Sequence, residues 1–161
     1  MDKSPEGASR IAIVHTTGQD KDFVLLCEAL DKHLTDTADD PDEQKAYDRH
    51  NGLEGVRDAF VAYADGVPAG CVAFKRYDDG VAEVKRMFVA DAFRGRGIAK
   101  SLLAALEEEA RKAGYASLIL ESAMRLKAAH GLYRDNGFAV IPNYGQYADM
   151  GNSLCMRKEI G

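Results

Sequence analysis

The sequence has 161 residues, of which 46% are hydrophobic and 29% charged, and its net charge is −5 at neutral pH. This composition is typical of one globular domain, and the acidic balance argues against nucleic acid or a membrane surface as a partner. The three cysteines and four histidines lack metal-ligand spacing, and no apolar run has membrane-spanning length, so we expect a cytoplasmic protein without a metal site.

The elements predicted from the residue pattern alternate between strands and helices. Residues 1–9 are predicted to be a flexible polar tail, and residues 10–161 a single domain. Alternating and β-branched residues predict strands at 10–15, 59–64, 69–75, 82–89, 117–121, 138–141 and 153–158. Helical spacing predicts helices at 22–33, 98–113 and 126–135, and the acidic segment 35–43 is predicted to be a loop. The order β-α-α-β-β-β-α-β-α-β-β predicts an α/β domain with one mixed, mostly antiparallel sheet.

The stretch FRGRGIAKSLLAALEEEARKAGY, residues 93–115, places two glycines and three cations at the start of a helix. Cations are unfavourable beside the positive end of a helix dipole, so a bound polyanion would explain them. Glycines there also let backbone amides approach an anion without a Cβ in the way. A glycine-rich turn with solvated arginines explains the same pattern, and the residues alone leave both readings open. The helix has an apolar stripe for the core at Ile98, Leu102, Leu106 and Ala110.

Two familiar phosphate motifs do not fit this loop. Ala99 stands where a Walker A loop needs glycine, and Lys100 stands where a dinucleotide fingerprint needs glycine or alanine. The pattern Arg-x-x-Gly-x-Ala, at Arg94, Gly97 and Ala99, follows EVKRMFV and precedes SLILESA and HGLYRDNGF. Over residues 82–138 these motifs resemble the coenzyme A pyrophosphate loop and core of the GCN5-related N-acetyltransferase (GNAT) superfamily. The resemblance implies a GNAT-like fold, a sheet of about seven strands flanked by about four helices.

The resemblance implies an acetyl-CoA-dependent N-acetyltransferase that transfers acetyl directly to a small amine in a ternary complex. Tyr133 matches the family tyrosine that protonates the leaving thiolate, and a phenol with a pKa near ~10 stays protonated at neutral pH. Considered alone, Tyr133 is better explained as a core aromatic residue on an amphipathic helix, and only the neighbouring loop motif favours the acid. The residues that the resemblance implies for acetyl-CoA binding are Met87, Phe88, Val89, Arg94, Gly95, Arg96, Gly97, Ile98, Ala99 and Lys100.

Glu83 occupies the position where histone-acetylating members of the superfamily carry a general base. A carboxylate near the acceptor can take the proton that an ammonium must lose before it attacks a thioester. Strand alternation puts Glu83 on one face with Lys85, Met87 and Val89, so a salt bridge is an equally good explanation for the residue. Both roles stay open at this stage.

The acceptor site is expected within residues 30–51 and 141–153, because the resemblance implies that two helices and the last hairpin enclose it. The second segment contains Tyr144 and Tyr147, which are candidate substrate-binding residues, although an ordinary turn-rich loop is the alternative. Acidic residues in both segments favour a small cationic amine over an acidic amino acid. These residues are Asp36, Asp39, Asp40, Asp42, Glu43 and Asp149.

Two classes of function fit these motifs. The first is the N-acetyltransferase, and the second is a non-catalytic acyl-CoA-binding or regulatory module. Tyr133 favours the enzyme, because binding alone does not require a phenol beside the sulfur. An acyl-enzyme on Cys27, Cys71 or Cys155 is disfavoured, since none has an activating neighbour in sequence. The sequence leaves open whether the chain forms a homodimer.

Overall fold

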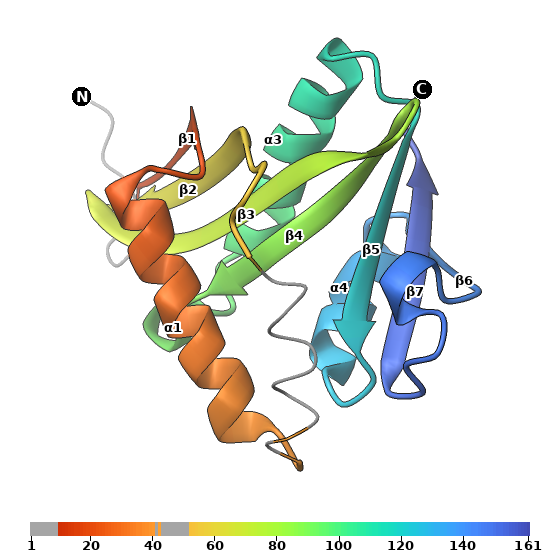
Figure 1. Cartoon of the computed structure of the whole chain (residues 1–161). Helices are drawn as coiled ribbons and strands as arrows, with labels where there is room; N and C mark the ends of the chain where they lie inside the picture. Colours follow the sequence, from red (N-terminus) through yellow and green to blue (C-terminus); the bar gives the residue numbers. More distant parts are fainter. Residues whose placement is uncertain (1–9, 41, 43–51) are drawn as a thin grey trace.

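A twisted sheet of seven strands, in the order β1-β2-β3-β4-β5-β7-β6, runs through the computed structural model (Figure 1). The structure describes residues 10–40, 42 and 52–161. The strands are β1 Ile11–Thr16, β2 Asp58–Ala64, β3 Val67–Asp78, β4 Val81–Val89, β5 Ser117–Ala123, β6 Ala139–Ile141 and β7 Ser153–Glu159. The helices are α1 Lys21–Thr37, α3 Ile98–Lys112 and α4 Lys127–Asp135, with 3-10 turns η1 at Asp91–Phe93 and η2 at Gly145–Tyr147.

The predicted fold class is confirmed, and the order of strands and helices along the described part of the chain agrees with the predicted order. All seven expected strands form, and only β4 and β5 pair in parallel, so the sheet is mixed and mostly antiparallel. Three α-helices lie in the described part of the chain. The tail predicted at 1–9 lies outside the described residues. Residues 41 and 43–51, within the segment 30–51 where the first two helices were expected, lie outside them as well.

Helix α1 extends further than predicted, because residues 35–37 are helical rather than part of the acidic loop. Two local contacts stabilise this last turn. Lys32 and Asp36 form an ion pair at i,i+4 spacing, with 2.6 Å between Nζ and Oδ2. The hydroxyl of Thr37 donates a 2.8 Å hydrogen bond to the carbonyl oxygen of His33. Helix α1 ends at Thr37, because the backbone of the next residue, Ala38, is extended.

The helices cover opposite faces of the sheet. Helix α1 buries Phe23, Leu26 and Leu30 against one face, in a cluster that includes Val61 and Phe88. Helix α3 buries the predicted stripe on the other face, in the main core, to which α4 contributes Tyr133. Burial of these apolar stripes stabilises each helix by removing hydrocarbon from water.

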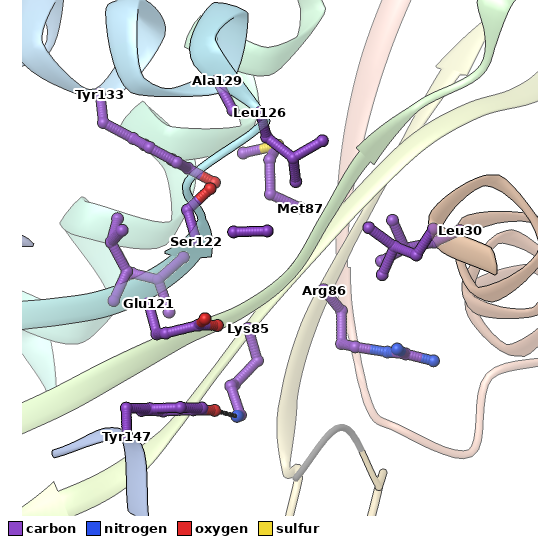
Figure 2. A pocket seen from close by; sticks show the side chains of 14 residues that line it. Leu30, Lys85, Arg86, Met87, Glu121, Ser122, Leu126, Ala129, Tyr133 and Tyr147 are labelled. Carbon is purple, nitrogen blue, oxygen red and sulfur yellow. Dashed lines mark hydrogen bonds between the residues drawn. The ribbon is translucent and has the colours of Figure 1, made fainter. Parts of the chain in front are cut away.

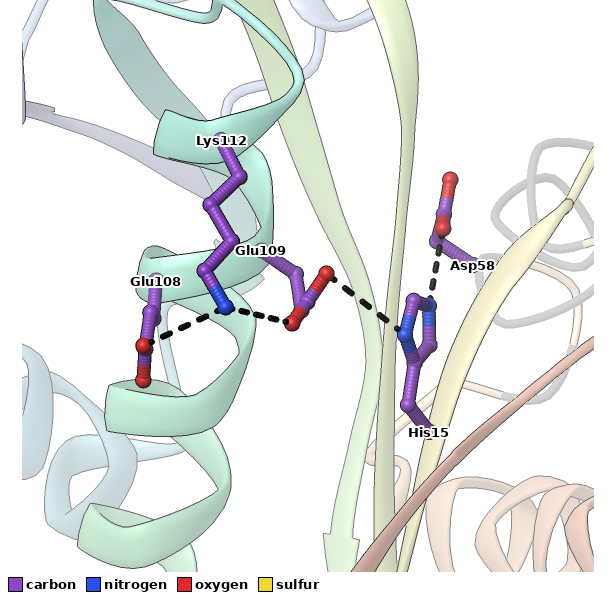
Figure 3. A network of polar contacts seen from close by, with 5 residues as sticks. All are labelled: His15, Asp58, Glu108, Glu109 and Lys112. Carbon is purple, nitrogen blue, oxygen red and sulfur yellow. Dashed lines mark hydrogen bonds and ion pairs between the residues drawn. The ribbon is translucent and has the colours of Figure 1, made fainter.

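A polar network joins the exposed side of α3 to the edge of the sheet (Figure 3). His15 of β1 lies between Asp58, 2.9 Å from Nε2, and Glu109, 3.7 Å from Nδ1. Lys112 continues the network, with Nζ 3.5 Å from Glu109 and 3.4 Å from Glu108. All five side chains are at least one-third exposed, so solvent screens these contacts and their effect on stability is small.

Strands β4 and β5 separate soon after they begin to pair. Their register covers Val81 with Ser117, Ala82 with Leu118 and Glu83 with Ile119, and no later pair is formed. The two strands then lead to different neighbours, β4 to η1 and β5 to α4. This separation opens the sheet between the middle of β4 and the end of β5, where the candidate active site lies.

The regular alternation that we predicted for β4 is wrong beyond Lys85, because the strand contains a bulge. The register with β3 shifts between Cys71 and Ala73, and Arg86 adopts a left-handed backbone with φ of 63°. A non-glycine residue in this conformation costs roughly 1–3 kcal/mol. Beyond the bulge, Met87 and Val89 pack against the α3 cluster. They therefore do not share a face with the ion-paired side chains of Glu83 and Lys85.

Candidate active site

A cleft of about 140 Å³ occupies the opening between β4 and β5 (Figure 2). Its walls come from α1, β4, β5 and α4, with η2 contributing Tyr147 at one end. Leu30 and Leu126 provide apolar surface on opposite sides. The charged residues in the lining, among those the structure describes, are Lys85, Arg86 and Glu121. Such a mixture of apolar walls and a few polar groups is usual for small-molecule sites.

Tyr133 lines this cleft from α4, and its side chain is almost completely buried. Its ring packs edge-on against Phe138, with 5.7 Å between the centroids, and its hydroxyl points toward Ser122 (Figure 2). Burial, and secondarily the negative charge of Glu121, raise the pKa of Tyr133 above its ordinary value. The phenol therefore remains protonated at neutral pH and can act as a proton donor.

Glu121 lies on β5, on the same side of the cleft as Tyr133 (Figure 2), and our sequence analysis did not identify it. The hydroxyl of Ser153 donates a 2.6 Å hydrogen bond to Oε2 of Glu121. Burial raises the pKa of the Glu121 carboxyl, and the Ser153 hydrogen bond and the charge of Lys85 only partly oppose this. The available signal was a carboxylate within the apolar strand SLILESA, which is unusual for a strand covered on both faces.

Glu83, our candidate base, is 1% exposed and is not among the residues that line the cleft. The hydroxyl of Tyr144 donates a 2.6 Å hydrogen bond to its Oε2. Nζ of Lys85 lies 3.7 Å from its Oε1, so the salt bridge that we gave as the alternative role is present. Lys85 also donates a 3.0 Å hydrogen bond to the Tyr147 hydroxyl, and burial lowers the pKa of its ammonium.

The two candidate substrate tyrosines occupy different positions in this network. Tyr147 lines the cleft at the end where Lys85 reaches it (Figure 2), although its side chain is only 1% exposed. Tyr144 is not in the lining, because its hydroxyl is held by Glu83. Burial raises the pKa of both phenols, and nearby carboxylates raise it further. The structure thus brings Tyr147 to the cleft and places Tyr144 behind it.

The glycine-rich loop forms a second hollow, of about 220 Å³, beyond the far end of β4. Gly95 and Gly97 have φ values of 79° and 76°, and a Cβ on either would meet no atom within 4 Å. The first hydrogen bond of α3 runs from Ser101 N to the Gly97 carbonyl, so the preceding amides of the helix lack a helical carbonyl partner. The hollow therefore presents open backbone donors at the start of a helix.

The three cations of the glycine-rich loop, Arg94, Arg96 and Lys100, make different contacts. Arg94 donates a 3.1 Å hydrogen bond from Nε to the Val89 carbonyl and pairs with Asp91 at 3.0 Å. Arg96 lies over the Phe93 ring, 5.5 Å from its centroid. Arg94 and Lys100 line the hollow, together with Val89, Gly95, Gly97, Ile98 and Ala99. Of the other predicted coenzyme residues, Met87 lines the first cleft and Phe88 packs beneath α1.

The acidic residues that we expected at the acceptor site do not line the cleft. Asp36 is exposed on α1 and pairs with Lys32. Asp39, Asp40, Asp42 and Asp149 are also exposed, and Glu43 lies outside the described residues. The electrostatic reason for a cationic acceptor is therefore not supported by the described part of the chain. No group of His, Cys, Asp or Glu among the described residues could hold a metal ion, and no helix there is long and apolar enough to cross a membrane.

Comparisons with known proteins point to one family. The model of the acetyltransferase (GNAT) family matches residues 26–138. The chain is 35% identical over 138 residues to an IAA acetyltransferase of Azospirillum brasilense, covering 85% of this chain and 90% of that protein. A Klebsiella pneumoniae structure assigned as an acyl-CoA N-acyltransferase has a TM-score of 0.76 at 27% identity, covering 94% and 98% of the two chains.

A more distant structure extends the likeness in fold. The PaiA N-acetyltransferase of Thermoplasma acidophilum, crystallised with coenzyme A, has a TM-score of 0.68 at 18% identity. The match covers 93% of this chain and 99% of that one. At this identity the likeness concerns the fold alone.

Proposed function

This chain belongs to the GNAT family and is an acetyltransferase, and from that premise we propose that it transfers acetyl from acetyl-CoA directly to a small amine. Both substrates would be bound together. The observation that carries the proposal is the pair of hollows at opposite ends of the open edge of β4. One presents backbone donors for an anion, and the other presents a buried phenol beside a carboxylate.

The glycine-rich hollow fits the pyrophosphate of coenzyme A. Gly95 and Gly97 have no side chain to obstruct an approaching anion, and the positive end of α3 favours negative charge there. Beyond Glu83, β4 has no β5 partner, so its main-chain groups on that side are open to a pantetheine arm at 87–89. The PaiA enzyme of similar fold was crystallised with coenzyme A. Acetyl-CoA would supply the reactive thioester.

Tyr133 and Glu121 divide the proton transfers between them. The amine must lose a proton as it attacks, and Glu121 lines the cleft with a raised pKa that improves it as a base near neutral pH. The departing sulfur must gain a proton, and the Tyr133 hydroxyl is the protonated donor in the same cleft. Their common position in the opening supports these complementary roles.

Glu83 is the alternative base. Its burial and its bonds to Tyr144 and Lys85 favour a positioning role, in which it holds the loop with η2 against β4. Proton transfer to Glu83 would have to pass through one of these two partners. We therefore assign the base to Glu121 and keep Glu83 as the residue to exclude by experiment.

The test measures release of free thiol from acetyl-CoA with a panel of primary amines. Direct transfer predicts intersecting lines in double-reciprocal plots when both substrates are varied, whereas a covalent acetyl-enzyme gives parallel lines. The three cysteines are buried, which favours the direct route. Coenzyme A binding without thiol release from any acceptor would support the non-catalytic alternative and contradict the proposal.

A further inference from the structure

Arg86 is the residue of the cleft with the most unusual environment. It is 8% exposed, and its backbone adopts the left-handed conformation of the β4 bulge. Regular alternation would put Lys85 and Arg86 on opposite faces of the strand, but both line the cleft. The two cations point in different directions, Lys85 toward Tyr147 and Arg86 toward Asp31 of α1, and backbone strain such as that at Arg86 is often related to function.

The guanidinium of Arg86 uses both of its terminal nitrogens in hydrogen bonds but not Nε. Its two terminal nitrogens donate to Asp31 of α1, at 2.7 Å for Nη1 and 3.0 Å for Nη2. Nη2 also lies 3.4 Å from the Cys27 carbonyl oxygen. Nε has no hydrogen-bond partner within the part of the chain that the structure describes. A buried N–H without a partner is costly, and such a group calls for an acceptor that completes it.

The cleft has opposite charges on opposite walls. Figure 2 shows Arg86 beside Leu30 of α1, whereas Glu121 lies with Tyr133 on the β5 and α4 side. The Asp31 carboxylate that partly balances Arg86 is 49% exposed and does not line the cleft. An acceptor with its amine near Glu121 therefore extends across the cleft toward Arg86, whose unpartnered Nε is buried in the α1 wall. A carboxylate fits that donor best, because charge-assisted hydrogen bonds are the stronger ones.

We propose that the acceptor is an amino acid, whose carboxylate binds Nε of Arg86 while its amino group lies at Glu121. This inference rests on the proposed transferase function and specifies its substrate class. It reverses our sequence-based preference for a cationic amine, because the acids behind that preference lie outside the cleft. Lys85 does not contribute to the carboxylate site, because its ammonium points toward Tyr147 on the Glu121 side of the cleft (Figure 2).

The first experiment compares matched acceptors on the wild-type enzyme. Each set contains an amino acid, its carboxamide and the amine that lacks the acid group, and thiol release from acetyl-CoA is measured. For the best amino acid, we expect kcat/KM at least about 10-fold above that of its carboxamide, the value of one hydrogen bond to a charged group. Equal or faster turnover of the carboxamide or the plain amine overturns the inference and leaves the transferase function standing. No thiol release from any acceptor contradicts the transferase function itself.

The second experiment uses Arg86→Gln, with the exposed Arg76→Gln of β3 as the matched control. Arg86→Gln should raise KM for the amino acid by about 10- to 100-fold and leave KM for the carboxamide within about 3-fold. Arg76→Gln should change neither value. Melting temperature and coenzyme A affinity verify that the variant is folded. A folded Arg86→Gln enzyme that keeps the wild-type preference for the carboxylate overturns the assignment, and if the variant does not fold, the wild-type comparison decides.

Discussion

The hydroxyl of Tyr144 donates a 2.6 Å hydrogen bond to Glu83, joining the loop before β7 to the buried middle of the sheet. Lys85 makes the next two contacts of the same network, to Glu83 and to Tyr147. Since Tyr147 lines the cleft, these contacts hold the wall of the candidate acceptor site against β4.

Tyr144→Phe should destabilise the fold, because it leaves the buried Glu83 carboxylate without its hydroxyl donor. An unsatisfied buried acceptor costs about 1–3 kcal/mol, which lowers the melting temperature by roughly 2–10 °C in a domain of this size. Thermal unfolding measures the change. Tyr115→Phe, whose ring packs on Phe74, is the control and should have little effect. Equal melting temperatures for Tyr144→Phe and the wild type would show that this hydrogen bond contributes nothing.

Tyr133→Phe should reduce kcat by about 10²–10⁴-fold, because it keeps the ring contact with Phe138 and removes the proton donor. Coenzyme A affinity should stay within about 3-fold of the wild type, since the glycine-rich hollow is unchanged. Single-turnover kinetics separates the chemical step from product release. An unchanged single-turnover rate would remove Tyr133 from the mechanism.

Glu121→Gln should reduce kcat/KM at neutral pH by about 10²–10⁴-fold if Glu121 accepts the proton of the amine. A base works only when deprotonated, and burial raises the pKa of Glu121, so the acidic limb of the rate profile should lie above the range of an ordinary carboxyl group. This carboxylate limb should be absent in the variant. The same acceptor is used throughout, so its own ionisation cancels in the comparison. Loss of the limb in Glu83→Gln but not in Glu121→Gln would reassign the base to Glu83.

Gly97→Val should weaken coenzyme A binding by at least about 10-fold, because it strains the left-handed backbone and adds a side chain where the anion is expected. Gly66→Val is a closely matched control. Gly66 lies in the turn between β2 and β3, with φ of 82° and open space around its Cβ position, so the two variants carry similar strain. Calorimetric titration of both variants should therefore show a loss of affinity for Gly97→Val alone. Comparable affinities would mean that the loop is only a turn.

Glu109→Gln should change the free energy of unfolding by less than about 1 kcal/mol, although it removes two charged contacts of the network in Figure 3. The side chains are well exposed, so salt should reduce even this effect. Urea unfolding at low and high ionic strength measures it. A loss of several kcal/mol would indicate that the His15 network holds α3 on the sheet.

Features that depend on a few neighbouring residues were predictable from the sequence. The stripe of α3 follows from apolar spacing, and the positive φ angles before it follow from Gly95 and Gly97. The burial of Tyr133 follows from the amphipathic pattern of α4. In each case the conformation depends mainly on residues close together in the sequence, so the local residue pattern was enough to predict it.

The composition of the acceptor cleft was decided only by tertiary structure. Regular alternation predicts one face for Glu83, Lys85 and Met87, but the pairing of β4 with β3 introduces a bulge at Arg86 that exchanges the faces beyond it. Glu121 reaches the cleft because β4 and β5 separate after Glu83, a consequence of non-local pairing. Register and strand separation depend on residues far apart in the chain, so the charges that meet at the acceptor could not be read from local pattern.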